Sequence, residues 1–183
     1  MKVDVGTIVR LKITELENFD PISVYIEGNF NYGKMTVEEF GQSWTGVWNA
    51  IGDDGIYSFV TTCGIDYLID SMCGNLRHVI EDTDNYDAVI RKEVLNQRRK
   101  RYIDSDLARK LYNHRDWLEM RNPDPERPLN RPPFEGIDQY DWDNICWENI
   151  DIPLVPNPNY LRMYERFSIV VQAIKREVAA GNV

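Results

Sequence analysis

The sequence has 183 residues, of which 43% are apolar and 28% charged, a balance typical of a folded globular protein rather than a disordered one. Its net charge of −9 argues against general affinity for nucleic acid or membrane surfaces, because both carry negative charge. The N-terminal segment does not have the pattern of a signal peptide, and no stretch reaches the roughly 18 apolar residues of a membrane span.

Short segments of alternating apolar and polar residues fill the first fifty positions. Turn residues such as Asp20-Pro21 and Gly33 separate them, as in an antiparallel meander. The predicted strands are 7–13, 21–28, 34–41 and 42–48.

Two tryptophans, Trp44 and Trp48, stand four residues apart in the last of these segments. Residues at this spacing share a side in a strand and in a helix alike, but Thr45 and Val47 favour a strand. We expect both indoles to help form a core between sheet and helices, and an exposed one would mark a partner site.

After Asp53 the apolar spacing becomes helical, and two short helices are predicted, one ending near Cys63 and one over 65–72. Stripes beginning at Tyr86 and at Leu107 predict two further helices in an antiparallel hairpin, the second capped by Asp104 or Ser105. A last helix is predicted from about Asn159, with a wide apolar stripe.

The predicted fold class is therefore α+β, with a sheet of about four antiparallel strands packed on helices, a helical hairpin and a long C-terminal helix. We expect a sheet region over 1–80 and a mostly helical region over 81–183, together forming one compact unit. Five prolines in 122–133 predict an extended loop there.

Charge is unevenly distributed along the chain. The net charge is −10 up to Ala88, +5 from Val89 to Arg131 and −4 from Pro132 onward. The basic helical arm, residues 91–115, is a candidate for binding phosphates, although cations at a helix C-terminus also favour the helix dipole. Its candidate nucleic-acid-binding residues are Arg91, Lys92, Arg98, Arg99, Lys100, Arg101, Arg109 and Lys110.

Carboxylates and aromatic side chains alternate over 138–148, the most unusual composition in the chain. Such a segment suits a basic groove on a protein partner, with tryptophans as anchors, or else packs on the core with solvated acids. The candidate partner-binding residues are Asp138, Tyr140, Asp141, Trp142, Asp143, Trp147 and Glu148.

Catalytic signals are sparse. The two histidines, His78 and His114, lie in no known motif, and Asp53-Asp54 is only a weak cation candidate because turns favour Asp. Cys63 and Cys73 resemble small buried apolar residues, and the three cysteines show no metal-type pairing. An odd number of cysteines without a signal peptide predicts reduced thiols in a cytoplasm. We therefore predict no catalytic residue, no metal and no cofactor.

The segment LKITELENFDPISV (11–24), with GQSWTGVW (41–48), GDDGIYSF (52–59) and later Cys63, Tyr67 and Leu68, resembles a family of small proteins of tailed phages and prophages. The phage proteins usually have Tyr where this chain has Phe40. The resemblance covers roughly the first 75 residues and carries no assigned activity. It implies a bacterial cytoplasm during infection or prophage carriage.

We therefore expect a non-enzymatic phage accessory protein that binds and modulates a host protein, such as a restriction or CRISPR-type defence factor or another nucleic-acid enzyme. The alternatives are nucleic-acid binding through the basic helical arm and an enzyme of unknown class. A homodimer through the C-terminal helix is a further possibility, using Tyr160, Tyr164 and Phe167.

Overall fold

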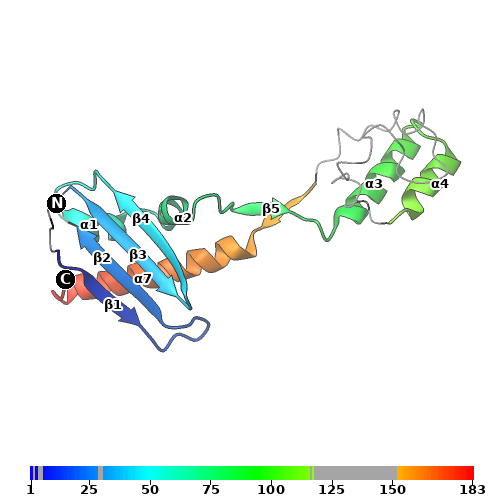
Figure 1. The fold of residues 1–183 in the computed structure, drawn as a ribbon. Coiled ribbons are helices and arrows are strands. Elements are labelled where there is room, and N and C mark those ends of the chain that lie inside the picture. Colours follow the sequence, from blue (N-terminus) through cyan, green and yellow to red (C-terminus); the bar gives the residue numbers. More distant parts are fainter. Residues whose placement is uncertain (2, 4–5, 29–30, 116, 118–151) are drawn as a thin grey trace. The chain divides into compact units, whose positions relative to one another are not determined.

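The computed structural model describes residues 1, 3, 6–28, 31–115, 117 and 152–183 (Figure 1). They form two compact units, the first made of 1–78 and 156–183 and the second of 79–155. The strands are β1 (Val9–Ile13), β2 (Ile22–Gly28), β3 (Gly33–Glu39), β4 (Gln42–Trp48), β5 (Val79–Glu81) and β6 (Leu154–Pro156). The helices are α1 (Gly55–Thr62), α2 (Ile65–Cys73), α3 (Tyr86–Arg99), α4 (Ser105–Asn113) and α7 (Pro158–Ala179). The predicted α+β class is confirmed.

The first unit is built on an antiparallel meander in the order β1-β2-β3-β4. Burial alternates along β2 and β3, because one face of the sheet is covered and the other is open to solvent. The register places Val24 beside Val37, and Val37 beside Trp44, on the covered face. The apolar residues that alternate with polar ones in the second predicted strand, Ile22, Val24 and Ile26, all lie on this covered face.

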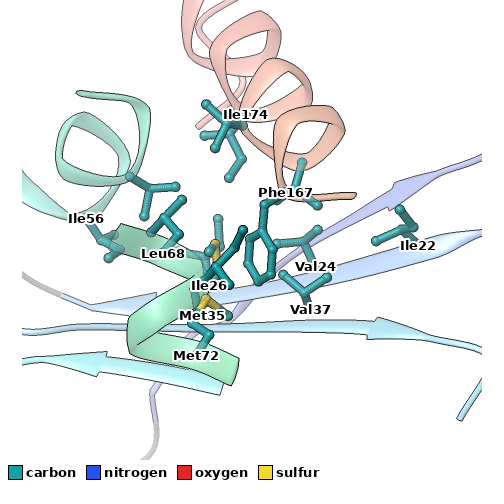
Figure 2. Close-up of a cluster of buried hydrophobic side chains, with 14 of the residues drawn as sticks. Ile22, Val24, Ile26, Met35, Val37, Ile56, Leu68, Met72, Phe167 and Ile174 are labelled. Atoms are coloured by element: carbon teal, nitrogen blue, oxygen red, sulfur yellow. The ribbon is translucent and has the colours of Figure 1, made fainter. Parts of the chain in front are cut away.

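Helices α1, α2 and α7 cover that face and complete the core (Figure 1). In Figure 2 the ring of Phe167, from α7, lies against Val24 and Val37 of the sheet, and Phe167 is fully buried. The buried stripe of α7 repeats at helical spacing, with Met163, Phe167, Val170 and Ile174 directed inward. The last helix thus supplies much of the layer that the sheet requires.

A buried ion pair links the end of β3 to α7. The Arg166 guanidinium donates to the Glu39 carboxylate, and the two residues are 6% and 5% exposed. The guanidinium lies 4.5 Å from the ring centroid of Trp44, and the Asp20 N–H donates to Glu39 Oε1 at 3.2 Å. A buried charge pair is tolerated only with such additional contacts.

The two tryptophans of β4, Trp44 and Trp48, have different surroundings. Trp48 is 6% exposed and lies in the core against Phe59, with ring centroids 5.4 Å apart. Trp44 is half-buried and covers the guanidinium of Arg166. The prediction that both help form the layer between sheet and helices holds, with Trp44 contacting a charge rather than only apolar side chains.

Strands β5 and β6 form a two-stranded sheet that the sequence did not predict. The Asp82 N–H donates to the Pro153 carbonyl, and the Asn157 N–H donates to the His78 carbonyl, both at 2.9 Å. These two bonds show that the strands run antiparallel. The chain leaves the first unit after His78 and re-enters it at Pro156, so the second unit is an insertion within the first.

Candidate functional site

The candidate site is the end of a helical hairpin in the second unit, where α3 turns into α4. A small apolar cluster holds the two helices together, with Ile90 and Val94 from α3 and Leu107 and Leu111 from α4. Ile103, in the connection, is also buried, at 4% exposed. The predicted hairpin is therefore present, and the buried Ile103 side chain anchors its connecting turn in the apolar cluster between the two helices.

Helix α3 ends in a Schellman motif. The Tyr102 N–H donates to the Gln97 carbonyl and the Arg101 N–H donates to the Arg98 carbonyl, which satisfies the last carbonyls of the helix. Arg101 has a φ of 62°, in the left-handed region, at the position where glycine is strongly preferred. An L residue there costs about 1 kcal/mol in backbone strain.

The turn ends at Asp104, the N-cap of α4. Its carboxylate accepts the N–H groups of Asp106 and Leu107 at 2.9 and 2.8 Å, which confirms one of the two predicted caps. The Leu107 N–H is the largest cause of a lowered pKa of Asp104, and the Asp106 N–H and the charges of Arg98 and Lys110 lower it further. Cations on both helices therefore act on the same turn.

Cations dominate this hairpin. Residues 86–115 contain nine cationic and four acidic side chains, a net charge of +5. Arg98, Arg99, Lys100 and Arg101 are all exposed, as is Tyr102 at 64%. The ammonium of Lys100 lies 6.0 Å from the Tyr102 ring centroid. The turn thus presents four consecutive positive side chains and an aromatic ring to solvent.

The other predicted cations divide into two groups. Lys92, Arg109 and Lys110 are exposed, and Arg109 lies 3.9 Å from Asp106. Arg91 instead binds within the hairpin, donating to the Tyr112 carbonyl at 3.1 Å and to Asp87 at 3.3 Å. Arg91 therefore holds the C-terminal end of α4 against α3 rather than standing free for a ligand.

Arg91 also borders an open depression of about 510 Å³. Its other lining residues among those described are Asp87, Tyr112, Asn113 and Arg115. The lining is polar, and the contacts of Asp87 and Arg91 are those that stabilise the hairpin. We assign this depression no chemistry of its own.

Both histidines pack on aromatic rings. His78 is exposed and stacks on Tyr160 at 4.0 Å, and the Tyr160 hydroxyl donates to Asp66 at 2.6 Å. Burial, and then the bond to Asp66, raise the pKa of Tyr160. The ring of His114 meets the ring of Trp117 edge to face, with the ring centroids 4.9 Å apart.

Among the described residues no group of three or more His, Cys, Asp or Glu is placed to hold a metal ion.

The described cysteines are half-buried against the core of the first unit. Burial raises the pKa of Cys73 to about 11, with Arg166 acting in the opposite direction, and burial also raises the pKa of Cys63. A thiol of high pKa is a poor nucleophile at neutral pH. These two side chains therefore behave as the small apolar residues that the sequence predicted.

A sequence profile of the phage family Phage_phiTE_072 matches residues 1–176 of the chain. The chain belongs to this phage family. The match covers residues of both units, whereas the resemblance found in the sequence lies within roughly the first 75 residues. No match was found among curated proteins or among solved structures.

The structure locates the predicted dimer residues of this phage protein but not its predicted partner-binding residues. The acidic-aromatic residues of 138–148 lie outside the described residues. Of the C-terminal aromatics, Tyr160 and Phe167 are buried in the core of the first unit, whereas Tyr164 is 42% exposed.

Within the described ranges, no helix of the phage protein is long and apolar enough to cross a bilayer.

Two exposed aromatic residues, Phe40 and Tyr102, were not recognised as candidates from the sequence. Phe40 is 87% exposed and has a φ of 47°, directly before Gly41 at 77°. The sequence interpretation placed Phe40 in the third strand. The signal that would have found it is the pair Phe-Gly between two alternating runs, since a two-residue hairpin ends in glycine.

Proposed function

We propose that this phage protein is a binding protein that contacts the phosphates of nucleic acid with the turn between α3 and α4. The observation that carries the proposal is Arg101, a cation held in a left-handed conformation where glycine costs less. The helix dipole accounts for cations in the last turn of α3, namely Arg98 and Arg99. The dipole also favours Lys100, the C-cap, but it gives no reason for a cation in place of glycine at the strained position of Arg101.

The net charge of −9 does not exclude this contact. At physiological ionic strength exposed charges are screened beyond a Debye length of about 8 Å, so the local +5 of the hairpin governs what binds there. The exposed ring of Tyr102, beside Lys100, offers a surface on which an unpaired base can stack. The combination favours a single strand over a duplex.

The test is fluorescence anisotropy with labelled single-stranded and duplex oligonucleotides at several salt concentrations. Three or four phosphate contacts give a slope of log affinity against log salt of about −2 to −3 for a single strand and about −3 to −4 for a duplex. Arg101→Gly makes this slope shallower by about 1 while stabilising the fold by about 1 kcal/mol, so weaker binding is separated from misfolding. Lys175→Ala, which removes an exposed cation of the first unit, is the matched control.

The proposal fails if Arg101→Gly and Lys175→Ala have the same effect, or if affinity does not depend on salt. Tyr102→Ser separates the two nucleic-acid forms. It weakens binding to a single strand, by about 1–3 kcal/mol for a stacked base, and leaves the duplex unaffected.

A second candidate is modulation of a host protein, such as a defence nuclease or another nucleic-acid enzyme. It is favoured by the composition of 138–148, in which Trp142 lies between two aspartates and Trp147 is followed by Glu148. Carboxylates beside aromatic rings resemble phosphates beside bases, and so suit a basic nucleic-acid-binding groove.

The test of this candidate is affinity capture from a bacterial host lysate, with and without nuclease. A stoichiometric host protein that survives nuclease and is lost with Trp142→Ala or Trp147→Ala supports it. Proteins that disappear on nuclease treatment, or capture unaffected by both variants, refute it. Circular dichroism confirms that the variants fold.

A further inference from the structure

The hairpin between β3 and β4 carries an aromatic residue that its own fold disfavours. Phe40 and Gly41 form a two-residue turn between the paired residues Glu39 and Gln42, and both have positive φ. Turns of this kind favour Asn-Gly or Asp-Gly, because a residue with a large side chain is strained at positive φ. Phe40 also leaves 87% of its surface in water. The backbone of Phe40 is therefore strained, and its ring gains no stabilisation from burial in return.

The base of this turn is rigidly held. Glu39 accepts from the Asp20 N–H and from the guanidinium of Arg166, and that guanidinium is covered by Trp44 at 4.5 Å. These contacts join the last residue of β3 to the β1–β2 loop and to α7. A side chain displayed on a fixed base loses less conformational entropy when it binds.

Acidic side chains lie at the same end of the sheet as the turn. The pairs Ile13–Ile22, Ile22–Glu39 and Glu39–Gln42 place the β1–β2 loop at the same end of the sheet as Phe40. The loop carries three exposed acids, Glu15, Glu17 and Asp20. The cation nearest the loop in sequence is Lys12, on β1, and Arg162 lies over Phe19 at 5.1 Å. The surroundings of the exposed ring are therefore net acidic.

We propose that Phe40 is the anchor by which this phage protein docks on another protein, in an apolar pocket bordered by Lys or Arg side chains. A rigid aromatic side chain entering a pocket is a common interface hot spot, and a cationic rim complements the three loop acids. A second copy that docked through this same turn would bring like charges together, and a lipid surface is itself anionic, so both are disfavoured as occupants. The proposal is independent of the cationic turn of α3 and α4.

The first test asks what Phe40 does for the fold. Phe40→Asn places the preferred residue in the turn, and we expect the melting temperature to rise by about 2–4 °C. Phe40→Tyr keeps the ring and should leave it unchanged. A fall in melting temperature with Phe40→Asn would show that the ring serves the fold, and would overturn the proposal.

The second test identifies the partner. The full chain with the photo-crosslinker benzoylphenylalanine at position 40 is produced during phage infection, and the crosslinked protein is identified, purified and titrated. We expect Phe40→Asn to bind this protein at least about 10-fold more weakly than the wild type, Phe40→Tyr to bind as the wild type does, and added salt to weaken binding. The control is the crosslinker at Val47, a 52% exposed residue of β4, which should not yield this protein.

The proposal is overturned by the absence of a protein crosslink at position 40, by a crosslink to a second copy of the chain, or by equal binding of Phe40→Asn and wild type. The oligonucleotide assay separates this proposal from the function above. Phe40→Asn should leave affinity for nucleic acid unchanged, whereas Arg101→Gly should leave binding to the crosslinked protein unchanged.

Discussion

The ion pair between Arg166 and Glu39 offers the sharpest test of how the first unit is held together. Arg166→Met removes the positive charge but keeps an unbranched apolar side chain that packs on Trp44 and Phe19. Glu39 is then a carboxylate at 5% exposure whose remaining hydrogen bond in the structure comes from the Asp20 N–H. The variant therefore isolates the effect of an uncompensated buried charge from the effect of lost packing.

The expected loss is about 3–5 kcal/mol, as for other buried pairs from which one partner is removed. A typical domain is stable by only about 5–15 kcal/mol, so the loss is a large share of the total. In urea unfolding followed by circular dichroism, with a slope of about 2 kcal/mol per molar, the midpoint falls by about 2 M.

The double variant Glu39→Gln with Arg166→Met is the control. Because it leaves no buried charge, it should recover most of the lost stability, as replacing a buried pair with uncharged residues often does. A loss below about 1 kcal/mol for Arg166→Met, or a double variant no more stable than Arg166→Met alone, would refute the reasoning.

Three further outcomes are expected. Alkylation of Cys73, measured by mass spectrometry, should be slow at pH 8 and accelerate about tenfold per pH unit up to about 11, because the thiolate is the reacting form; a plateau near pH 8 would contradict this. Gln97→Met should raise stability by about 1 kcal/mol in thermal unfolding, because the buried Gln97 Oε1 accepts no hydrogen bond from any residue that the structure describes; a loss of stability would show that the rest of the Gln97 amide contributes to the fold. Replacing 79–155 by a short Gly-rich turn should leave the first unit folded, judged by circular dichroism, because His78 and Asn157 are joined by a hydrogen bond; an unfolded product would contradict the insertion.

The sequence predicted the sheet well because its signal is local. Alternation at Ile22, Val24 and Ile26 determines the covered face, and a one-residue error would have exposed all three. The helical stripe of α7 was equally clear. The turn at Phe40 was missed because a phenylalanine is rarely found at positive φ, so the strand appeared to continue through it.

The features that were not predicted depend on contacts between residues far apart in sequence. No periodicity marks Arg166 as buried, because its partners lie on β3, β4 and the β1–β2 loop. Strands β5 and β6 have three residues each, too few to show alternation, and form only by pairing with each other. In the candidate site the composition revealed the cations, whereas only the backbone conformation distinguished Arg101 from its neighbours.

The position of α7 in the chain has a consequence for synthesis on the ribosome. The sheet is translated first, but the helix that contributes Phe167 to its covered face is translated last, after the whole of the inserted unit. At about 5–20 residues per second, roughly 5–20 s separate the end of β4 from the start of α7. During that interval the apolar face of the nascent sheet lacks its largest covering helix. A chain that terminates before Pro158 would present this face to chaperones and to other nascent chains, and so be prone to aggregation.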